Sequence, residues 1–193
     1  GRADLGMLRL VDQIWTSDNT EATARLAIQE GFLQLFPANT MEAWVTDAQA
    51  ERISLTFRFH ASMCGSLGVG GHLLHWGAEG RATAAALIAQ YKTIRPIVQL
   101  GDLYRLHSAQ QGALAALQFV SKDRRESVLF LFRTYLPEPA ILPLIYLRGL
   151  EPTALYRVDG YAEPRSGAAW MYSGLPCDLG NFESRLLQIQ RQD

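Results

Sequence analysis

The sequence has few cysteines, few lysines and no long apolar run, and each shortage excludes a class of protein. Its two cysteines, Cys64 and Cys177, cannot form a disulfide framework, and no feature of the pattern supports a single bridge between them. We therefore expect a reduced setting, and because no signal-peptide pattern is present we expect a cytoplasmic protein. No apolar stretch approaches the roughly 20 residues of a membrane span, so no membrane partner is expected.

An excess of either charge is also missing. The 18 basic and 19 acidic residues give a net charge of −1, and Lys92 and Lys122 are the only lysines. Binding to nucleic acid depends mostly on neutralising phosphates, so the absence of a basic cluster argues against a nucleic-acid partner. Hydrophobic residues make up 48% of the 193 residues, which is an ordinary globular composition for one large domain or two small ones.

The first half of the chain alternates short strand-like runs with helical patterns. We expect strands at 13–16, 43–46 and 67–74, and helices at about 20–36, 53–66 and 78–106. The strand starts are roughly 25–30 residues apart, a spacing typical of βα units with parallel strands. Because a closed barrel needs eight such units, residues 1–107 are predicted to be the C-terminal part of a (β/α)8 TIM barrel.

The second half changes character after residue 107. Short β-type runs are separated by turn signals such as SKDRRE, RGLEPT and DGYAEP. The expected strands are 114–120, 127–135, 142–147, 155–158, 169–171 and 185–191. Their close spacing predicts a small antiparallel β-sandwich domain over residues 108–193.

Asp18 stands at the junction between the first expected strand and the helix that follows it. In a barrel this is the C-terminal end of the strands, where active sites lie. Asp18 with Glu21 also fits a capping box, and Asn19 could serve as the cap instead, so the local pattern by itself favours capping over catalysis. Asp47 has a similar position after AWVT and is likewise interpreted as a turn or cap residue.

The other reactive side chains form no recognisable motif. The four histidines, His60, His72, His75 and His107, lack the spacing of metal ligands. The stretch GSLGVGGH lacks the Lys and Ser/Thr of a phosphate loop, so its glycines indicate tight packing. The tryptophans Trp15 and Trp44 near strand ends could stack on a sugar ring, which makes Trp15 a candidate for substrate binding, although core packing is the favoured interpretation.

Several stretches resemble glycoside hydrolase family 36, the family of bacterial α-galactosidases. The resemblance begins with GRADLGML and IWTSDNTEATARLAIQEG and continues through YKTIRPIVQLGDLYRL. The stretches LRGLEPTALYRVDG and SGLP resemble the C-terminal β-domain of that family. The chain does not start with a methionine, so we expect that its first residue lies in the middle of a domain. By the resemblance, Gly1 and Arg2 are expected to be the remnant of a glycine-rich loop.

The resemblance implies a retaining α-galactosidase that removes terminal α-galactose from oligosaccharides of the melibiose or raffinose type. It implies that Asp18 is the general acid/base, that no metal or organic cofactor is needed, and that the protein is a homo-oligomer, by default a tetramer. The nucleophile of the family lies on an earlier strand, and neither Asp12 nor Glu21 is placed to replace it, so the chain alone is expected to be inactive. Two alternatives stay open, a galactosyltransferase of the same family and a non-catalytic folding or assembly module.

Overall fold

The computed structural model describes residues 4–138 and 141–192, so Gly1 and Arg2 lie outside the described residues. The chain forms two compact units, Gly1–Arg95 and Pro96–Asp193. Each unit has its own sheet, and the division falls within a long helix, ahead of the boundary predicted at residue 107.

Among the described residues of the first unit, three parallel strands form a sheet in the order β1-β2-β3. The strands are β1 (Ile14–Trp15), β2 (Met41–Val45) and β3 (Ser66–Val69), joined by helices α1 (Ala22–Leu33) and α2 (Leu55–Ser62) and short 3-10 helices at Met7–Arg9 (η1), Ala38–Thr40 (η2) and Leu73–Trp76 (η3). The predicted βα units are confirmed. The third strand ends at Val69, although it was predicted to reach residue 74. The backbone N–H of Gly70 donates to the carbonyl of Val45 at the end of β2, and the backbone then turns away from the sheet.

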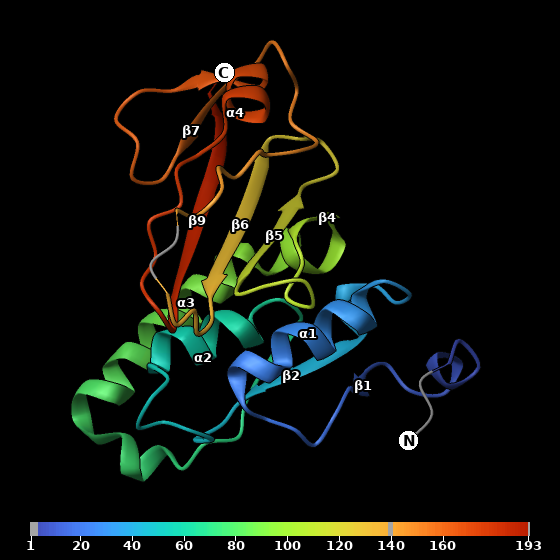
Figure 1. Ribbon diagram of the computed structural model, residues 1–193. Helices are drawn as coiled ribbons and strands as arrows, with labels where there is room; N and C mark the ends of the chain where they lie inside the picture. The colour runs from blue at the N-terminus through green and yellow to red at the C-terminus, as the bar shows by residue number, and fades with distance from the viewer. Residues whose placement is uncertain (1–3, 139–140, 193) are drawn as a thin grey trace. The chain divides into compact units, whose positions relative to one another are not determined.

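The two faces of this sheet have different environments. Met41, Ala43 and Val45 are fully buried, and α1 and α2 pack against β2 (Figure 1). Because side chains alternate along a strand, Glu42 and Trp44 point to the opposite face, and the β1 partner of Glu42 in register is Trp15. That second face therefore carries the aromatic and acidic side chains.

The long helix α3 (Gly77–Leu100) ends earlier than the sequence predicted. The prediction of helix up to residue 106 is wrong, because strand β4 (Asp102–His107) begins directly after Gly101. A Cβ at Gly101 would overlap the carbonyl oxygens of Ile97 and Val120, so only glycine fits where the helix turns into the strand.

The second unit contains a six-stranded antiparallel sheet within its described residues, in the order β4-β5-β6-β9-β7-β8. Figure 1 shows β5, β6 and β9 running side by side. The remaining strands are β5 (Leu114–Val120), β6 (Glu126–Arg133), β7 (Leu155–Val158), β8 (Arg165–Ser166) and β9 (Glu183–Gln192). This confirms the predicted fold class, a barrel part followed by an antiparallel β-domain.

Two predicted strands of this unit have another structure. The run at 169–171 belongs to helix α4 (Gly167–Ser173), because the Ser166 hydroxyl accepts a hydrogen bond from the Ala169 backbone N–H and caps the helix. The run at 142–147 forms only an isolated bridge between Ile145 and Leu175. These segments cover one face of the sheet and contribute much of the second layer of the core, whose buried members include Leu129, Leu131, Ile145, Leu147, Leu150, Tyr156, Trp170, Leu175 and Ile189.

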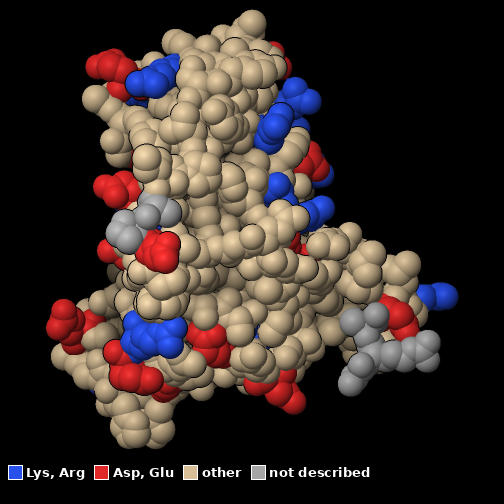
Figure 2. Space-filling view, in the orientation of Figure 1, with Lys and Arg blue, Asp and Glu red and all other residues tan. Residues whose placement is uncertain are grey.

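Charged side chains are dispersed over the surface face shown in Figure 2, where both signs occur among wide uncharged areas. Among helices of the described ranges, none combines the length and apolar character that crossing a membrane requires.

Candidate active site

Asp18 lies in the loop between β1 and α1, beyond the C-terminal end of a parallel strand. It is exposed, and its Oδ1 accepts a hydrogen bond of 2.9 Å from the indole Nε1 of Trp15. The sequence prediction for its position, at the carboxyl ends of the strands, is therefore met. Its carboxylate is held by a side chain three residues earlier and is accessible to a ligand.

The predicted capping role of Asp18 is wrong, because Glu21 is the N-cap of α1. The Glu21 carboxylate accepts hydrogen bonds from the backbone N–H groups of Thr23, at 3.1 Å, and Ala24, at 2.7 Å. Asn19 does not cap the helix either, since its Oδ1 accepts from the backbone N–H of Glu21. The Asp18 carboxylate thus accepts no hydrogen bond from the N-terminal backbone N–H groups of α1 in the described structure.

Two of the tryptophans of the first unit, Trp15 and Trp44, contact each other on the sheet face opposite the helices. The ring centroids of Trp15 and Trp44 are 4.5 Å apart with planes inclined by 38°. The Trp44 indole donates to Glu42 Oε1 at 2.6 Å, and its ring lies so close to Gly68 that a Cβ there would overlap it. Trp44 is 39% exposed, so the favoured interpretation of core packing is wrong for it. Substrate binding by Trp15 stays a prediction.

Asp47, the second candidate carboxylate, is held by three donors. Its Oδ1 accepts from Arg58 Nη1 at 3.0 Å and Trp76 Nε1 at 2.6 Å, and its Oδ2 accepts from the His72 backbone N–H at 2.6 Å. Burial acts to raise the pKa of Asp47, but these hydrogen bonds and the Arg58 charge outweigh it and lower the pKa below its usual value. Asp47 is thus a structural anchor, which agrees with its predicted turn role.

Arg25 is the residue of this region that sequence reasoning missed. It lies on α1 and is only 1% exposed, yet its guanidinium reaches back under the loop that carries Asp18. It donates to the carbonyls of Ser17 and Asn19 and to the hydroxyl of Thr16. The sequence does contain an indication of this role. Arg25 occurs four residues after Glu21, on the face of α1 that otherwise carries buried residues.

The histidines and cysteines form no reactive cluster among the described residues. His60 is buried in α2, and burial lowers its pKa to about 4, so it is neutral at pH 7. The rings of His72 and His75 stack 3.8 Å apart at the start of η3. No group of three or more metal-binding side chains occurs among the described residues. Cys64 and Cys177 are both free thiols.

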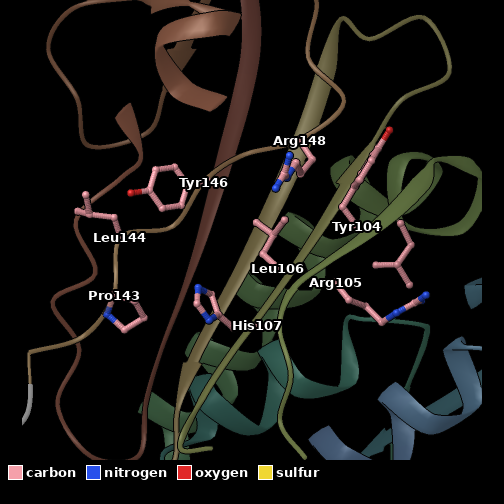
Figure 3. Close-up of a pocket in the computed structure, with 9 residues that line it drawn as sticks. Tyr104, Arg105, Leu106, His107, Pro143, Leu144, Tyr146 and Arg148 are labelled. Carbon is pink, nitrogen blue, oxygen red and sulfur yellow. The ribbon is translucent and has the colours of Figure 1, made fainter. Parts of the chain in front are cut away.

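A cavity of about 500 Å³ lies beside β4 in the second unit (Figure 3). Pro143, Leu144 and Tyr146 form one wall, and His107 comes from β4. Among the described residues that line it there is no carboxylate, so this cavity does not compete with Asp18 as a site of acid–base chemistry.

Comparison with known families accounts for both units. The family model Melibiase matches residues 1–101, which include Asp18, and the glycosyl hydrolase family 36 C-terminal domain matches residues 114–189.

Individual relatives agree with these matches. Probable α-galactosidase G of Emericella nidulans is 39% identical over 198 residues, which cover 100% of this chain and 27% of the relative. α-Galactosidase AgaA of Geobacillus stearothermophilus is 35% identical over 196 residues, which cover 98% of this chain and 27% of the relative. The chain thus spans about a quarter of the length of the curated relatives it matches.

Solved structures show the same fold. The α-galactosidase AgaB of Geobacillus stearothermophilus matches with a TM-score of 0.90 at 35% identity, covering 97% of this chain and 27% of AgaB. A variant of AgaA in complex with raffinose matches with a TM-score of 0.90 at 33% identity and the same coverage. With a family model over more than half of its length and this structural agreement, the chain belongs to glycoside hydrolase family 36.

Proposed function

We propose that this chain is the C-terminal part of a retaining α-galactosidase in which Asp18 is the general acid/base. One observation carries the assignment: the Asp18 carboxylate lies beyond the C-terminal end of a parallel strand, exposed, and takes no part in capping α1. The relatives matched over this segment are named α-galactosidases, which supports the reaction class.

In the proposed reaction the two carboxylates of a retaining glycosidase act from opposite sides of the anomeric carbon, about 5–5.5 Å apart. The nucleophile attacks the anomeric carbon while protonated Asp18 gives its proton to the departing glycosidic oxygen. Ionised Asp18 then takes a proton from water as that water attacks the same carbon and releases the enzyme carboxylate. We assign the nucleophile to a barrel strand other than the three described here.

The proposed substrates are oligosaccharides that end in α-galactose, of the melibiose and raffinose class. Relatives of known structure support this class, since AgaA variants have been solved in complex with raffinose and with stachyose. A cytoplasmic location is part of the same proposal and agrees with the free thiols. A homo-oligomer, by default a tetramer, is proposed from the family resemblance alone. A bacterial source is likewise a proposal. The match to AgaA of Geobacillus stearothermophilus supports it, whereas other matched relatives come from fungi.

The test uses the full-length protein that contains this segment, with melibiose and raffinose as substrates. We expect galactose to be released, initially as the α anomer in proton NMR spectra, because two inversions give net retention. We expect Asp18→Asn to lower kcat/KM for melibiose by about 10²–10⁴-fold, whereas Asp12→Asn, in an exposed acid ahead of β1, serves as the matched control. Initial release of the β anomer, or full activity in Asp18→Asn, would refute the proposal.

A further inference from the structure

The loop that carries Asp18 is held by a buried cation and an indole ring. We propose that Arg25 and Trp15 are positioning residues for Asp18, which fix one oxygen of its carboxylate and leave the other for proton transfer. This inference rests on the proposed function, because it concerns how the same carboxylate is presented to the glycosidic oxygen.

Arg25 holds the backbone on both sides of Asp18. Its Nη1 lies 3.1 Å from the carbonyl oxygen of Ser17 and 3.0 Å from that of Asn19, the residues that flank Asp18. Its Nη2 lies 3.0 Å from the Thr16 hydroxyl. Because the guanidinium is planar and rigid, its contacts fix the positions of these loop atoms relative to one another. The flexible ammonium group of a lysine could not do this.

Arg25 is a buried cation that is held by neutral oxygen atoms. Its side chain is almost fully buried, and the ion pairs found among the described residues do not include it. Its Nε is buried and has no acceptor within the described part of the chain. The buried Nε atoms of Arg58, Arg133 and Arg191 lack an acceptor among the described residues as well. What distinguishes Arg25 is therefore that its other nitrogens donate to the loop that carries Asp18.

The same cation acts on the ring of Trp15. The guanidinium carbon of Arg25 lies 4.6 Å from the centre of that ring, and Trp44 contacts the ring as well. A cation over an indole is attracted to the π face and draws electron density from the ring. The N–H group of Trp15 is thereby made a stronger donor, and the ring is held where that donor can reach Asp18.

The hydrogen bond from Trp15 then selects one orientation of an otherwise exposed carboxylate. Trp15 Nε1 lies 2.9 Å from Asp18 Oδ1, so Oδ1 is occupied as an acceptor in both protonation states. The transferable proton is therefore carried by Oδ2, which has no hydrogen-bond partner in the described residues. Oδ2 is the atom that we assign to the glycosidic oxygen in the first step and to water in the second.

The test compares kcat/KM of Trp15→Phe for melibiose and for nitrophenyl α-galactoside in the full-length protein. The substitution keeps an aromatic ring beside Arg25 and Trp44 but removes the N–H donor. Because misplacement of a catalytic group by about 1 Å can cost about 100-fold, we expect a loss of about 10–100-fold on melibiose. On nitrophenyl α-galactoside the loss should stay within about threefold, since nitrophenolate leaves with little protonation. KM should change little on melibiose, whereas on nitrophenyl α-galactoside kcat and KM should fall together, because Oδ2 also serves the second step and its misplacement lets the covalent intermediate accumulate.

Two further variants keep the inference open to refutation. Benzothienylalanine at position 15 retains the bicyclic shape without the N–H and should give the same pattern even where Trp15→Phe folds poorly. Arg25→Lys keeps the charge but loses the forked contacts, and should also lose more rate on melibiose than on the nitrophenyl substrate. Trp44→Phe is the matched control, because it removes an indole N–H on the same face whose acceptor is Glu42.

The outcomes separate the inference from the proposed function. Equal losses on both substrates, no loss on either, or the same pattern in Trp44→Phe would overturn the positioning role. Asp18→Asn is measured in parallel: if it retains activity on melibiose, the proposed function itself fails. If Asp18→Asn shows a loss that depends on the leaving group while the position-15 variants do not, only the positioning role is refuted.

Discussion

Arg58 and Asp47 form an ion pair, with Nη1 of Arg58 3.0 Å from Oδ1 of Asp47, which joins α2 to the loop after β2. Asp18 and Asp47 both lie in loops that follow neighbouring parallel strands, but their surroundings differ. Asp47 has both oxygens occupied by three donors, whereas Asp18 has one oxygen bound to one indole. A carboxylate held in its ionised form is a poor proton donor at neutral pH, so Asp47 is the weaker candidate for the general acid/base.

The first prediction concerns the stability that Asp47 provides. Because its pKa in the folded protein is lowered, its contribution is present above the unfolded-state pKa of about 3.9 and is lost as pH falls through the lower, folded value. Asp47→Asn should therefore lower the free energy of unfolding by about 1–3 kcal/mol at pH 7. In acid, as pH falls below the unfolded-state value of about 3.9, the difference should shrink, since protonated Asp47 loses the same interactions. Melting curves at pH 7 and at a pH below that value check this, and an equal difference at both would contradict it.

His60 gives a second pH dependence, at higher pH. Its pKa is about 4 in the folded protein and about 6.5 in an unfolded chain, so between these values the unfolded state binds the extra proton. Stability should thus decline as pH falls from about 6.5 to 4, by on the order of 3 kcal/mol in total, and the decline from this group should end below pH 4. His60→Gln should flatten the slope of unfolding free energy over this range. An unchanged slope in a folded variant would assign the effect to another group.

A third prediction separates Glu21 from Asp18 as helix caps. Removing an N-cap side chain costs about 0.5–2 kcal/mol, so Glu21→Ala should lower the melting temperature measurably. Asp18→Ala should change it little, because Asp18 makes no hydrogen bond to the backbone N–H groups of α1. The reverse order of melting temperatures would restore the capping box that the sequence predicted.

The sequence predicted most of this architecture, and its failures have physical causes. The βα periodicity and the all-apolar run around β6 were recoverable, because hydrophobic spacing reflects burial directly. The cap of α1 was not, since Asp18, Asn19 and Glu21 are all possible caps and only the path of the chain chooses among them. The start of β4 was missed because nothing local distinguishes Gly101 from a tolerated helical glycine. Arg25 was missed because an arginine on a helix is usually exposed.

The fourth prediction is that the isolated 193-residue chain is inactive and self-associates. Within residues 4–138 and 141–192 we assign no nucleophile to the reaction, and the sheet face with Trp15 and Trp44 presents partly exposed aromatic rings. Sedimentation velocity should show oligomers or aggregates, and nitrophenyl α-galactoside should not be cleaved above the background rate. A monodisperse monomer would contradict the first part. Turnover that persists through repurification would contradict the second and would direct attention to Glu42, a carboxylate on the same face of the sheet.

The last prediction uses azide to identify the acid/base in the full-length protein. Asn at position 18 can still accept the Trp15 hydrogen bond through its amide oxygen, so the loop should keep its shape, but it can neither give nor take a proton. With nitrophenyl α-galactoside the glycosylation step needs little protonation, and the covalent intermediate should accumulate because water is no longer activated. Azide needs no base, and its addition should restore turnover and yield α-galactosyl azide. Asp47→Asn, measured beside it, should show reduced thermal stability without azide rescue. Rescue at position 47 and not at position 18 would move the acid/base assignment to Asp47, while rates unchanged from wild type in Asp18→Asn would remove Asp18 from the reaction.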